Sequence, residues 1–205
     1  MPSLTEVARV AGLVVLSYLL GGIPTGYLAV RWLRGIDIRE HGSGNPGTAN
    51  VYRIAGVVPG VITLVVDGLK GFVPVMLAQR FFPHQAVVMM LCGAAAIIGH
   101  DWTVFLGFKG GKGVATSAGV FAAMMPKPLA AAVAAFIVGY AASGHISVGS
   151  IAAAAALPVF NLVFQTPLPF TAMAAAAAAL ILFKHLPNIK RLLAGKELFL
   201  HEKKY

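Results

Sequence analysis

The sequence predicts an all-α integral membrane protein, and two features of the chain support this. Hydrophobic residues make up 58% of the chain and charged residues only 11%, whereas about 25% of the residues in a typical soluble domain are charged. Apolar runs also recur from end to end, several of them near the roughly 20 residues that a helix needs to cross a hydrocarbon core. Because nearly all of the chain would lie in the bilayer, we expect a single domain over residues 1–205.

Seven apolar segments follow one another, at about residues 10–32, 57–81, 86–98, 114–125, 129–142, 146–164 and 170–183. Three of them are short for a full span, and runs of about 10–14 apolar residues can instead be re-entrant or interfacial. We therefore predict seven transmembrane helices, with five as the lower count. Pro24 removes a backbone donor from the first segment and predicts a kink there.

The net charge of +9 raises the possibility of nucleic-acid binding, but the positions of the basic residues favour a membrane protein without a nucleic-acid partner. In the seven-helix arrangement one side collects Arg31, Arg34, Arg39, Arg53, Lys109, Lys112, Lys184, Lys190, Arg191, Lys196, Lys203 and Lys204. The other side collects Arg9, Arg80 and Lys127. Because the side rich in Lys and Arg faces the cytoplasm, we expect the N-terminus outside and the C-terminus inside. All the motifs described below then lie at the cytoplasmic face, next to membrane lipids.

A first glycine-rich motif, GSGNPGTAN, lies in the polar stretch at residues 34–53. Glycines allow conformations in which backbone N–H groups converge on an anion, and Arg53, just after the motif, adds a charge that can bind two oxygens. The alternative is an ordinary turn-rich connection, which the same residue types favour. The candidate ligands in the motif are Gly42, Ser43, Gly44, Asn45, Gly47 and Asn50.

A second glycine-rich motif, FKGGKGVAT, spans residues 108–116. Glycines followed at once by an apolar helix predict a helix N-terminus that can receive a phosphate. The motif is not a P-loop, because Gly113 stands where Ser or Thr is needed and no strand precedes it. Lysines that extend to a membrane boundary are the alternative. The candidate ligands are Lys109, Gly110, Gly111, Lys112 and Gly113.

Ionisable residues lie near both motifs. His100, followed by Asp101, ends the third segment and is a candidate base or phosphate ligand, or simply a helix cap. Asp67 and Lys70 are three residues apart on one face of the second segment. Because ionisable groups are costly at membrane depth, we predict an ion pair that holds the site together.

Polar residues in two further stretches complete the candidate site. Ser147 and Ser150 begin the sixth segment, where a helix N-cap is the alternative role. His185 and Asn188 follow the seventh segment and share a helix face. Cys92 is the only cysteine, so a cysteine metal site is excluded, and we expect neither a metal nor a cofactor.

Five motifs in a fixed order resemble a known family. They are YLLGGIPTGYL, GSGNPGTANVYR, DGLKGFVPV, GHDWTVFLGFKGGKGVAT and KHLPNIKRLLAGKE. In the order, spacing and hydropathy of these motifs the chain is similar, over nearly its whole length, to the acyl-phosphate:glycerol-3-phosphate acyltransferases (the PlsY family).

The resemblance implies seven transmembrane helices in a bacterial plasma (inner) membrane. It also implies transfer of a fatty acyl group from acyl phosphate to the 1-hydroxyl of glycerol 3-phosphate, giving lysophosphatidic acid and phosphate, the first step of bacterial phospholipid synthesis. Catalytic roles would fall to Ser43, Arg53, Lys112 and His185. Substrate-binding or supporting roles would fall to the motif glycines and to Asn45, Lys70, His100, Lys109, Ser147 and Asn188.

The chain departs from the family pattern at four places. Gly22 stands where many members have Ser, Thr48-Ala49 reverses the usual order, and Thr103 replaces a common proline. His145 lies near where an aromatic or basic pair is usual. None of these changes removes a necessary charge, so they bear on hydrogen bonds in the first motif rather than on activity.

The chemistry fits the residue types. Phosphate is a good leaving group, so an acyl phosphate needs no covalent enzyme intermediate, and positioning of the substrates supplies much of the catalysis. We expect direct attack of the glycerol hydroxyl, with the first motif and Arg53 binding one phosphate and Lys112 the other. His185 and a phosphate oxygen of the donor are the two candidates for the base.

A small membrane transporter for phosphorylated metabolites is the alternative from another class of protein. It would need polar residues that reach through the midplane from both sides, whereas the outer connections of this chain are nearly bare. A structural subunit that binds anionic lipid would not need several glycine-dense loops on one face.

Overall fold

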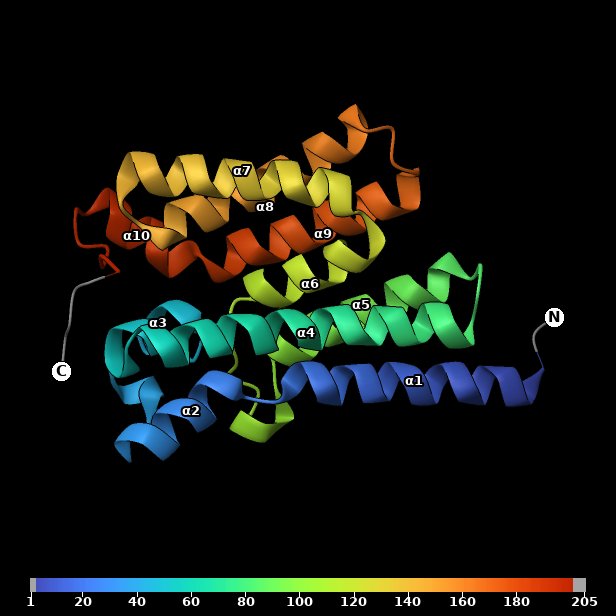
Figure 1. Cartoon of the computed structure of the whole chain (residues 1–205), viewed down its shortest axis with the longest axis horizontal. Coiled ribbons are helices and arrows are strands. Elements are labelled where there is room, and N and C mark those ends of the chain that lie inside the picture. Colours follow the sequence, from blue (N-terminus) through green and yellow to red (C-terminus); the bar gives the residue numbers. More distant parts are fainter. Residues whose placement is uncertain (1–2, 201–205) are drawn as a thin grey trace. The chain divides into compact units, whose positions relative to one another are not determined.

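The computed structural model describes residues 3–200, and every regular element in this part of the chain is a helix (Figure 1). The predicted all-α class is therefore confirmed. In chain order the elements are α1 (Leu4–Gly22), α2 (Thr25–Arg34), η1 (Ile38–Glu40), α3 (Thr48–Ala55), α4 (Val57–Phe81), α5 (Ala86–Asp101), η2 (Val104–Leu106), α6 (Val114–Met124), α7 (Pro126–Ser143), α8 (Ile146–Val163), α9 (Leu168–Lys184) and α10 (Leu186–Leu193), where η marks a short 3-10 helix.

Five of the described helical stretches are long and apolar enough to cross a membrane, by length and composition: Leu4–Arg34, Val57–Phe81, Ala86–Leu106, Pro126–Ser143 and Ile146–Val163. A sixth is added if α9 and α10, which meet at a bend of 53°, count as one span. All seven predicted segments are helical, but α6 is a shorter apolar helix, so seven spans remain a prediction. Val58, Val87 and Val138 are each 67% exposed, as expected of helix faces that contact lipid.

The predicted interruption of the first segment is confirmed, since α1 ends at Gly22 and α2 begins at Thr25. The polar stretch before α4 differs from the prediction, because part of it is helix α3 rather than loop. This helix forms because Val51 and Ile54 share one apolar face, which packs with Ile38 in a buried cluster. Arg53 therefore has the fixed backbone of a helix.

The described chain divides into two compact units, each built from two separate stretches of sequence. Unit 1 contains the chain up to Thr25 and Val65–Met124, and unit 2 contains Gly26–Leu64 and the chain from Met125 onward. Helix α4 contributes to both. The single domain predicted for the whole chain remains a prediction.

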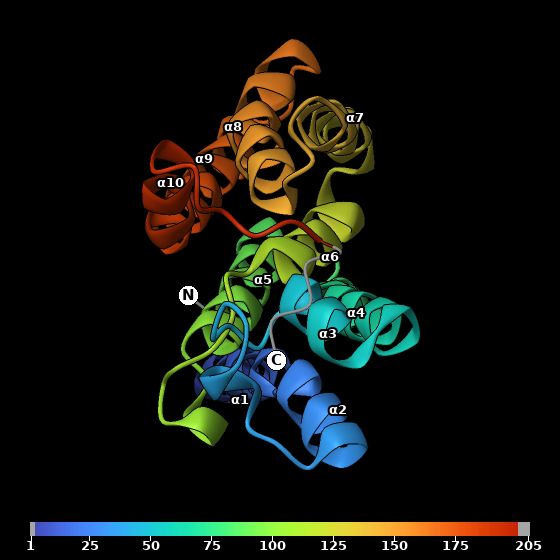
Figure 2. The ribbon, with the colours of Figure 1, turned by 90° about the vertical axis from the view of Figure 1, so that its left-hand side faces the viewer.

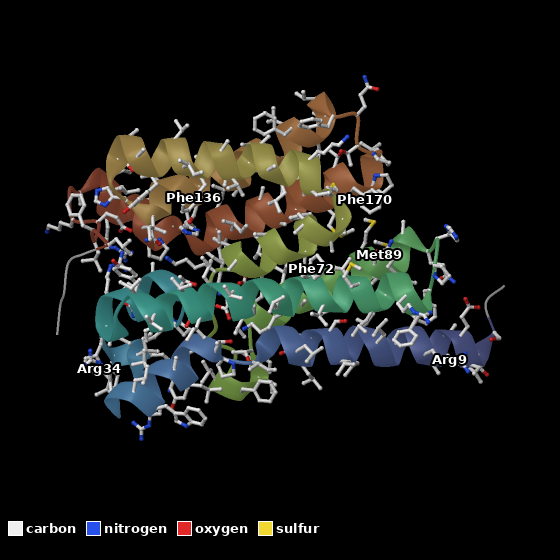
Figure 3. All side chains as sticks on the ribbon, viewed as in Figure 1. Arg9, Arg34, Phe72, Met89, Phe136 and Phe170 are labelled. Carbon is white, nitrogen blue, oxygen red and sulfur yellow. The ribbon has the colours of Figure 1, made fainter. Side chains whose placement is uncertain are left out.

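In unit 1, α1 packs against α5. Gly21 of α1 meets the main chain of Ala96 in α5, where a Cβ atom would overlap the Ala96 carbonyl. Further along these helices, Met89, labelled in Figure 3, packs against a buried cluster around Phe82 and Cys92. Contact between small residues brings the backbones close enough for dispersion forces to hold the helices together in lipid.

In unit 2, α8 lies beside both α7 and α9. Gly149 of α8 fits against Phe136 of α7, which is labelled in Figure 3. The chain bends at His185, which ends α9 and precedes α10. Residues 196–200, called here the C-terminal strap, follow α10 and form the last described part of the red segment in Figure 2.

Candidate functional site

The first glycine loop, residues 42–47 in unit 2, is shaped by the side chain of Asn50. The Asn50 Oδ1 atom accepts a hydrogen bond of 3.0 Å from the Ser43 N–H, and its Nδ2 donates to the carbonyl oxygens of His41 (3.0 Å) and Ile38 (3.4 Å). Gly42 has a φ of +60°, and a Cβ atom there would overlap Asn50 Oδ1. Asn50 is 1% exposed. Asn50 therefore belongs to the framework of the loop, and its predicted contact with substrate remains a prediction.

Two predicted ligands, Ser43 and Asn45, lie on this loop with half-buried side chains. Asn45 Oδ1 accepts a hydrogen bond of 2.9 Å from the Gly47 N–H, which tightens the turn that leads into α3. The loop is thus a rigid platform with a hydroxyl and an amide on it, next to the helix that carries Arg53.

Arg53 lies in the last turn of α3, is 9% exposed and is held by the C-terminal strap. Its Nε donates a hydrogen bond of 2.9 Å to the Phe199 carbonyl oxygen, and its Nη2 donates one of 3.2 Å to the Leu198 carbonyl oxygen. Phe199 is 146 residues further along the chain. No local pattern predicts these partners, and the strap was missed by the sequence analysis.

A second polar group of unit 2 gathers around Glu197 in the strap. The Asn188 Nδ2 donates a hydrogen bond of 2.5 Å to Glu197 Oε1, and Arg191 Nε lies 2.7 Å from Glu197 Oε2. Asn188 and Glu197 are buried. Glu197 was not among the residues predicted from the sequence, although an acidic residue within a basic tail was a signal that could have identified it.

The pKa of Glu197 is lowered overall. Burial works in the opposite direction and is the largest single effect, since it disfavours the carboxylate. Hydrogen bonds from Asn188 and Arg191, with a contribution from the Ser147 hydroxyl, together outweigh burial and stabilise the charged form. Glu197 is therefore an anion at neutral pH, and it orients Asn188.

Ser147 is not the N-cap of its helix, which was the alternative to a binding role. His145 precedes α8 instead, and Ser147 is buried at the second helical position. His185 is also buried, and its Nδ1 lies 2.8 Å from the Ile181 carbonyl oxygen of α9. A carbonyl oxygen only accepts, so Nδ1 carries a proton, and Nε2 is the accepting nitrogen whenever the ring is neutral.

In unit 1, the second glycine loop, residues 109–113, leads directly into α6, as predicted. The Gly111 N–H donates to the His100 carbonyl oxygen at 3.0 Å, and the Gly110 N–H donates to the Asp101 carbonyl oxygen at 3.2 Å. The His100 ring lies so close to Gly111 that a Cβ atom there would overlap its Nε2. His100 and Asp101 thus brace the loop. Lys112 is half-buried within it, whereas Lys109 is exposed.

The predicted ion pair between Asp67 and Lys70 is confirmed. Lys70 Nζ lies 2.7 Å from Asp67 Oδ1 and donates a hydrogen bond of 2.5 Å to the Ile23 carbonyl oxygen. The Lys70 side chain is 6% exposed and the Asp67 side chain 3%. Lys70 thus fastens α4 to the break between α1 and α2, and we assign it a structural role.

The structure thus places the predicted residues in two groups. Unit 2 holds the first glycine loop with Arg53, Ser147, His185 and Asn188, and unit 1 holds the second glycine loop with Lys70 and His100. Within residues 3–200 no cluster of three or more His, Cys, Asp or Glu side chains is arranged to hold a metal ion. Arg53 and the two lysines of the second glycine loop, Lys109 and Lys112, carry charges that suit an anion.

A family model described as glycerol-3-phosphate acyltransferase matches residues 11–195, which is most of the chain. The chain belongs to this family. Glycerol-3-phosphate acyltransferase 2 of Moorella thermoacetica is 45% identical to this acyltransferase over 184 residues, which cover 90% of this chain and 94% of the relative. The glycerol-3-phosphate acyltransferase of Geobacter sulfurreducens is 45% identical over 186 residues, which cover 90% of this chain and 94% of that relative.

Solved structures of PlsY (YgiH), an integral membrane glycerol 3-phosphate acyltransferase, are similar to this acyltransferase in fold. The glycerol 3-phosphate form matches with a TM-score of 0.88 and 38% identity, and the lysophosphatidic acid form with 0.85 and 37%. Both matches cover 93% of this chain and 95% of the solved one. The predicted membership of the family and the multi-pass membrane architecture are confirmed, and the transporter alternative has no support among these relatives.

Proposed function

We propose that this acyltransferase moves a fatty acyl group from an acyl phosphate to the 1-hydroxyl of glycerol 3-phosphate, giving lysophosphatidic acid and inorganic phosphate. The observation that carries the proposal is that PlsY, 38% identical to this chain, has been solved in a glycerol 3-phosphate form and in a lysophosphatidic acid form. These two molecules are the acceptor and the product of one acyl transfer.

The choice of acyl phosphate as donor rests on the five motifs and on the chemistry of the candidate residues. An acyl phosphate is a mixed anhydride and is already activated, so transfer from it requires charge neutralisation and orientation rather than an enzyme nucleophile. The glycerol hydroxyl oxygen attacks the acyl carbonyl carbon, the bond from that carbon to the phosphate oxygen breaks, and the hydroxyl proton passes to a base. Arg53 and Lys112 supply positive charge for the two phosphates.

Within this scheme the first glycine loop and Arg53 bind one phosphate, and the second glycine loop and Lys112 bind the other. Lys112 or a backbone N–H also stabilises the oxyanion that forms on the acyl carbonyl. The rigid Asn50 framework supports this assignment, because donors that are held in place need little reorganisation when charge develops.

His185 is the protein's candidate for the base. The bond from Nδ1 to Ile181 sets the tautomer in which Nε2 accepts a proton, as a base requires. A phosphate oxygen of the donor is the second candidate, and the His185 variant described in the Discussion distinguishes between them.

For the cellular setting we propose a bacterial plasma (inner) membrane, with the site at the cytoplasmic face and the N-terminus outside. The support is the excess of Lys and Arg on one side of the predicted spans. The substrates and product are phosphorylated, and the product is a lipid, so the reaction belongs at the boundary between cytoplasm and membrane, at the first step of phospholipid synthesis.

The experiment that tests the proposal is acyl transfer by the purified protein in detergent or lipid. Glycerol 3-phosphate is offered with palmitoyl phosphate and, separately, with palmitoyl-CoA, and lysophosphatidic acid and released phosphate are measured. We expect product from the acyl phosphate alone. Product from palmitoyl-CoA would overturn the donor assignment, and no product from either donor with folded protein would overturn the reaction.

A further inference from the structure

The C-terminal strap (residues 196–200) lies beyond residue 195, where the match to the family model ends. It leaves α10 through Gly195, whose φ is +65°, and runs without regular structure (Figure 2). Despite this, its main chain makes two of the hydrogen bonds that hold Arg53.

These two bonds determine the orientation of the guanidinium. Nε and Nη2 lie on one edge of the planar group, and they donate to the carbonyl oxygens of two consecutive residues, Phe199 and Leu198. Two bonds on one edge fix both the direction and the plane of the guanidinium, as in bidentate pairs of Arg with carboxylates. A shift of the strap would therefore change where Arg53 points.

The strap is itself fastened at two points. Glu197 is bonded to Asn188 and Arg191, as described above. The ring of Phe199 stacks on the ring of His145 at the start of α8, with 4.3 Å between the ring centroids. It also lies against Gly144, where a Cβ atom would come within 3.2 Å of the ring. Phe199 is 53% exposed, so this stack, rather than burial in a core, sets its position.

We propose that the C-terminal strap is a positioning element for Arg53, and that the stack of Phe199 on His145 latches it. The inference rests on the proposed role of Arg53 in phosphate binding. When the strap is in place, Arg53 is oriented before the substrate arrives. Without the Phe199–His145 stack, the guanidinium must be ordered during binding, which weakens affinity for the phosphate.

The test compares Phe199→Ala, Phe199→Leu and Phe199→Tyr in the acyl-transfer assay, with KM measured for both substrates. We expect Phe199→Ala to raise the KM of one substrate about tenfold, the change that corresponds to ~1.4 kcal/mol of binding, with a smaller effect on kcat. Arg53→Lys should raise the KM of the same substrate. Phe199→Tyr keeps the ring and should restore the wild-type value. Phe164→Ala, a change of a similarly exposed phenylalanine at the end of α8, is the matched control.

A double-mutant cycle decides whether the strap acts through Arg53. In an Arg53→Lys background the effect of Phe199→Ala should disappear, because the guanidinium that it orients is gone. An unchanged KM in Phe199→Ala, or a full effect that persists beside Arg53→Lys, would overturn the proposal. If Phe199→Ala does not fold, Phe199→Leu, which removes the stack but keeps bulk, decides by the same criteria. An inactive wild-type protein would instead overturn the proposed function.

Discussion

The hydroxyl of Thr103 donates a hydrogen bond of 2.6 Å to the carbonyl oxygen of Gly22. Gly22 is the last residue of α1, and Thr103 lies two residues after the end of α5, so this bond ties the ends of two neighbouring helices of unit 1. Thr103 is 2% exposed. The two residues are in contact, since a Cβ atom on residue 22 would lie 3.0 Å from Thr103 Oγ1.

We predict that Thr103→Val lowers stability by about 1–3 kcal/mol, the usual cost of removing one partner from a buried hydrogen bond. Valine keeps the shape of threonine but cannot donate to the Gly22 carbonyl. Thermal unfolding in detergent measures the effect as a melting temperature lower by several degrees. The control is Thr5→Val, at an exposed position of α1, which should have the same melting temperature as the wild type. Equal melting of all three proteins would contradict the prediction.

Lys70→Met should destabilise the protein by about 3–5 kcal/mol, because it leaves the Asp67 carboxylate buried without its partner at 2.7 Å. The double variant Asp67→Leu/Lys70→Met should recover most of the loss, since an apolar pair of similar size can replace a buried ion pair at little cost. Unfolding in detergent measures both. A double variant as unstable as Lys70→Met would show that the lysine matters for reasons other than its pairing with Asp67.

Lys112→Ala should lower kcat by about 10²–10³-fold if its charge stabilises the oxyanion or phosphate in the transition state. Lys109→Ala is the matched control, because that lysine belongs to the same loop but is exposed. Charges in contact with water contribute little, so its effect should stay within about fivefold. Lysophosphatidic acid formation at saturating substrates is the measurement. Similar losses in both variants would argue for a general effect of loop charge.

His185→Ala tests the general base. If the His185 Nε2 removes the hydroxyl proton, turnover should fall by about 10²–10⁴-fold, and the loss should be seen in the kcat of the folded protein. His185→Gln keeps a polar group of similar length but no base, and it should be as slow. Near-normal turnover in both variants would assign the base role to the phosphate of the donor.

Glu197 makes the stability depend on pH in a predictable direction. Its native pKa lies below the ordinary value of 4.5, so its contribution is fully present above that value and is lost as the pH falls through the native pKa. We expect the melting temperature in detergent to fall as the pH drops below about 4.5. The fall should be shallower in Glu197→Gln, which has no charge to lose. Identical pH profiles of the two proteins would exclude this residue as a source of acid sensitivity.

Several features could be predicted from the sequence because they depend on residues close together along the chain. Apolar runs located the helical segments, Pro24 located the break after α1, and the spacing of Asp67 and Lys70 on one helical face predicted their ion pair. The glycines before residue 114 located the start of α6. Helical periodicity and turn preferences act over three or four residues, so the order of residues alone determines such features.

Other features were decided only by the tertiary structure. Thr103 bonds to Gly22, which is 81 positions away in the sequence, and Arg53 bonds to the strap residues 145 and 146 positions further on. The helix around Arg53 forms because apolar residues pack on one of its faces, and the polar residues nearby obscured that pattern in the sequence. Asn50, which looked like a ligand, supports its own loop, and Glu197 had no assigned role until Asn188 and Arg191 were seen around it. Hydrogen bonds between distant residues depend on how the helices pack, and no local preference encodes which carbonyl a given side chain will meet.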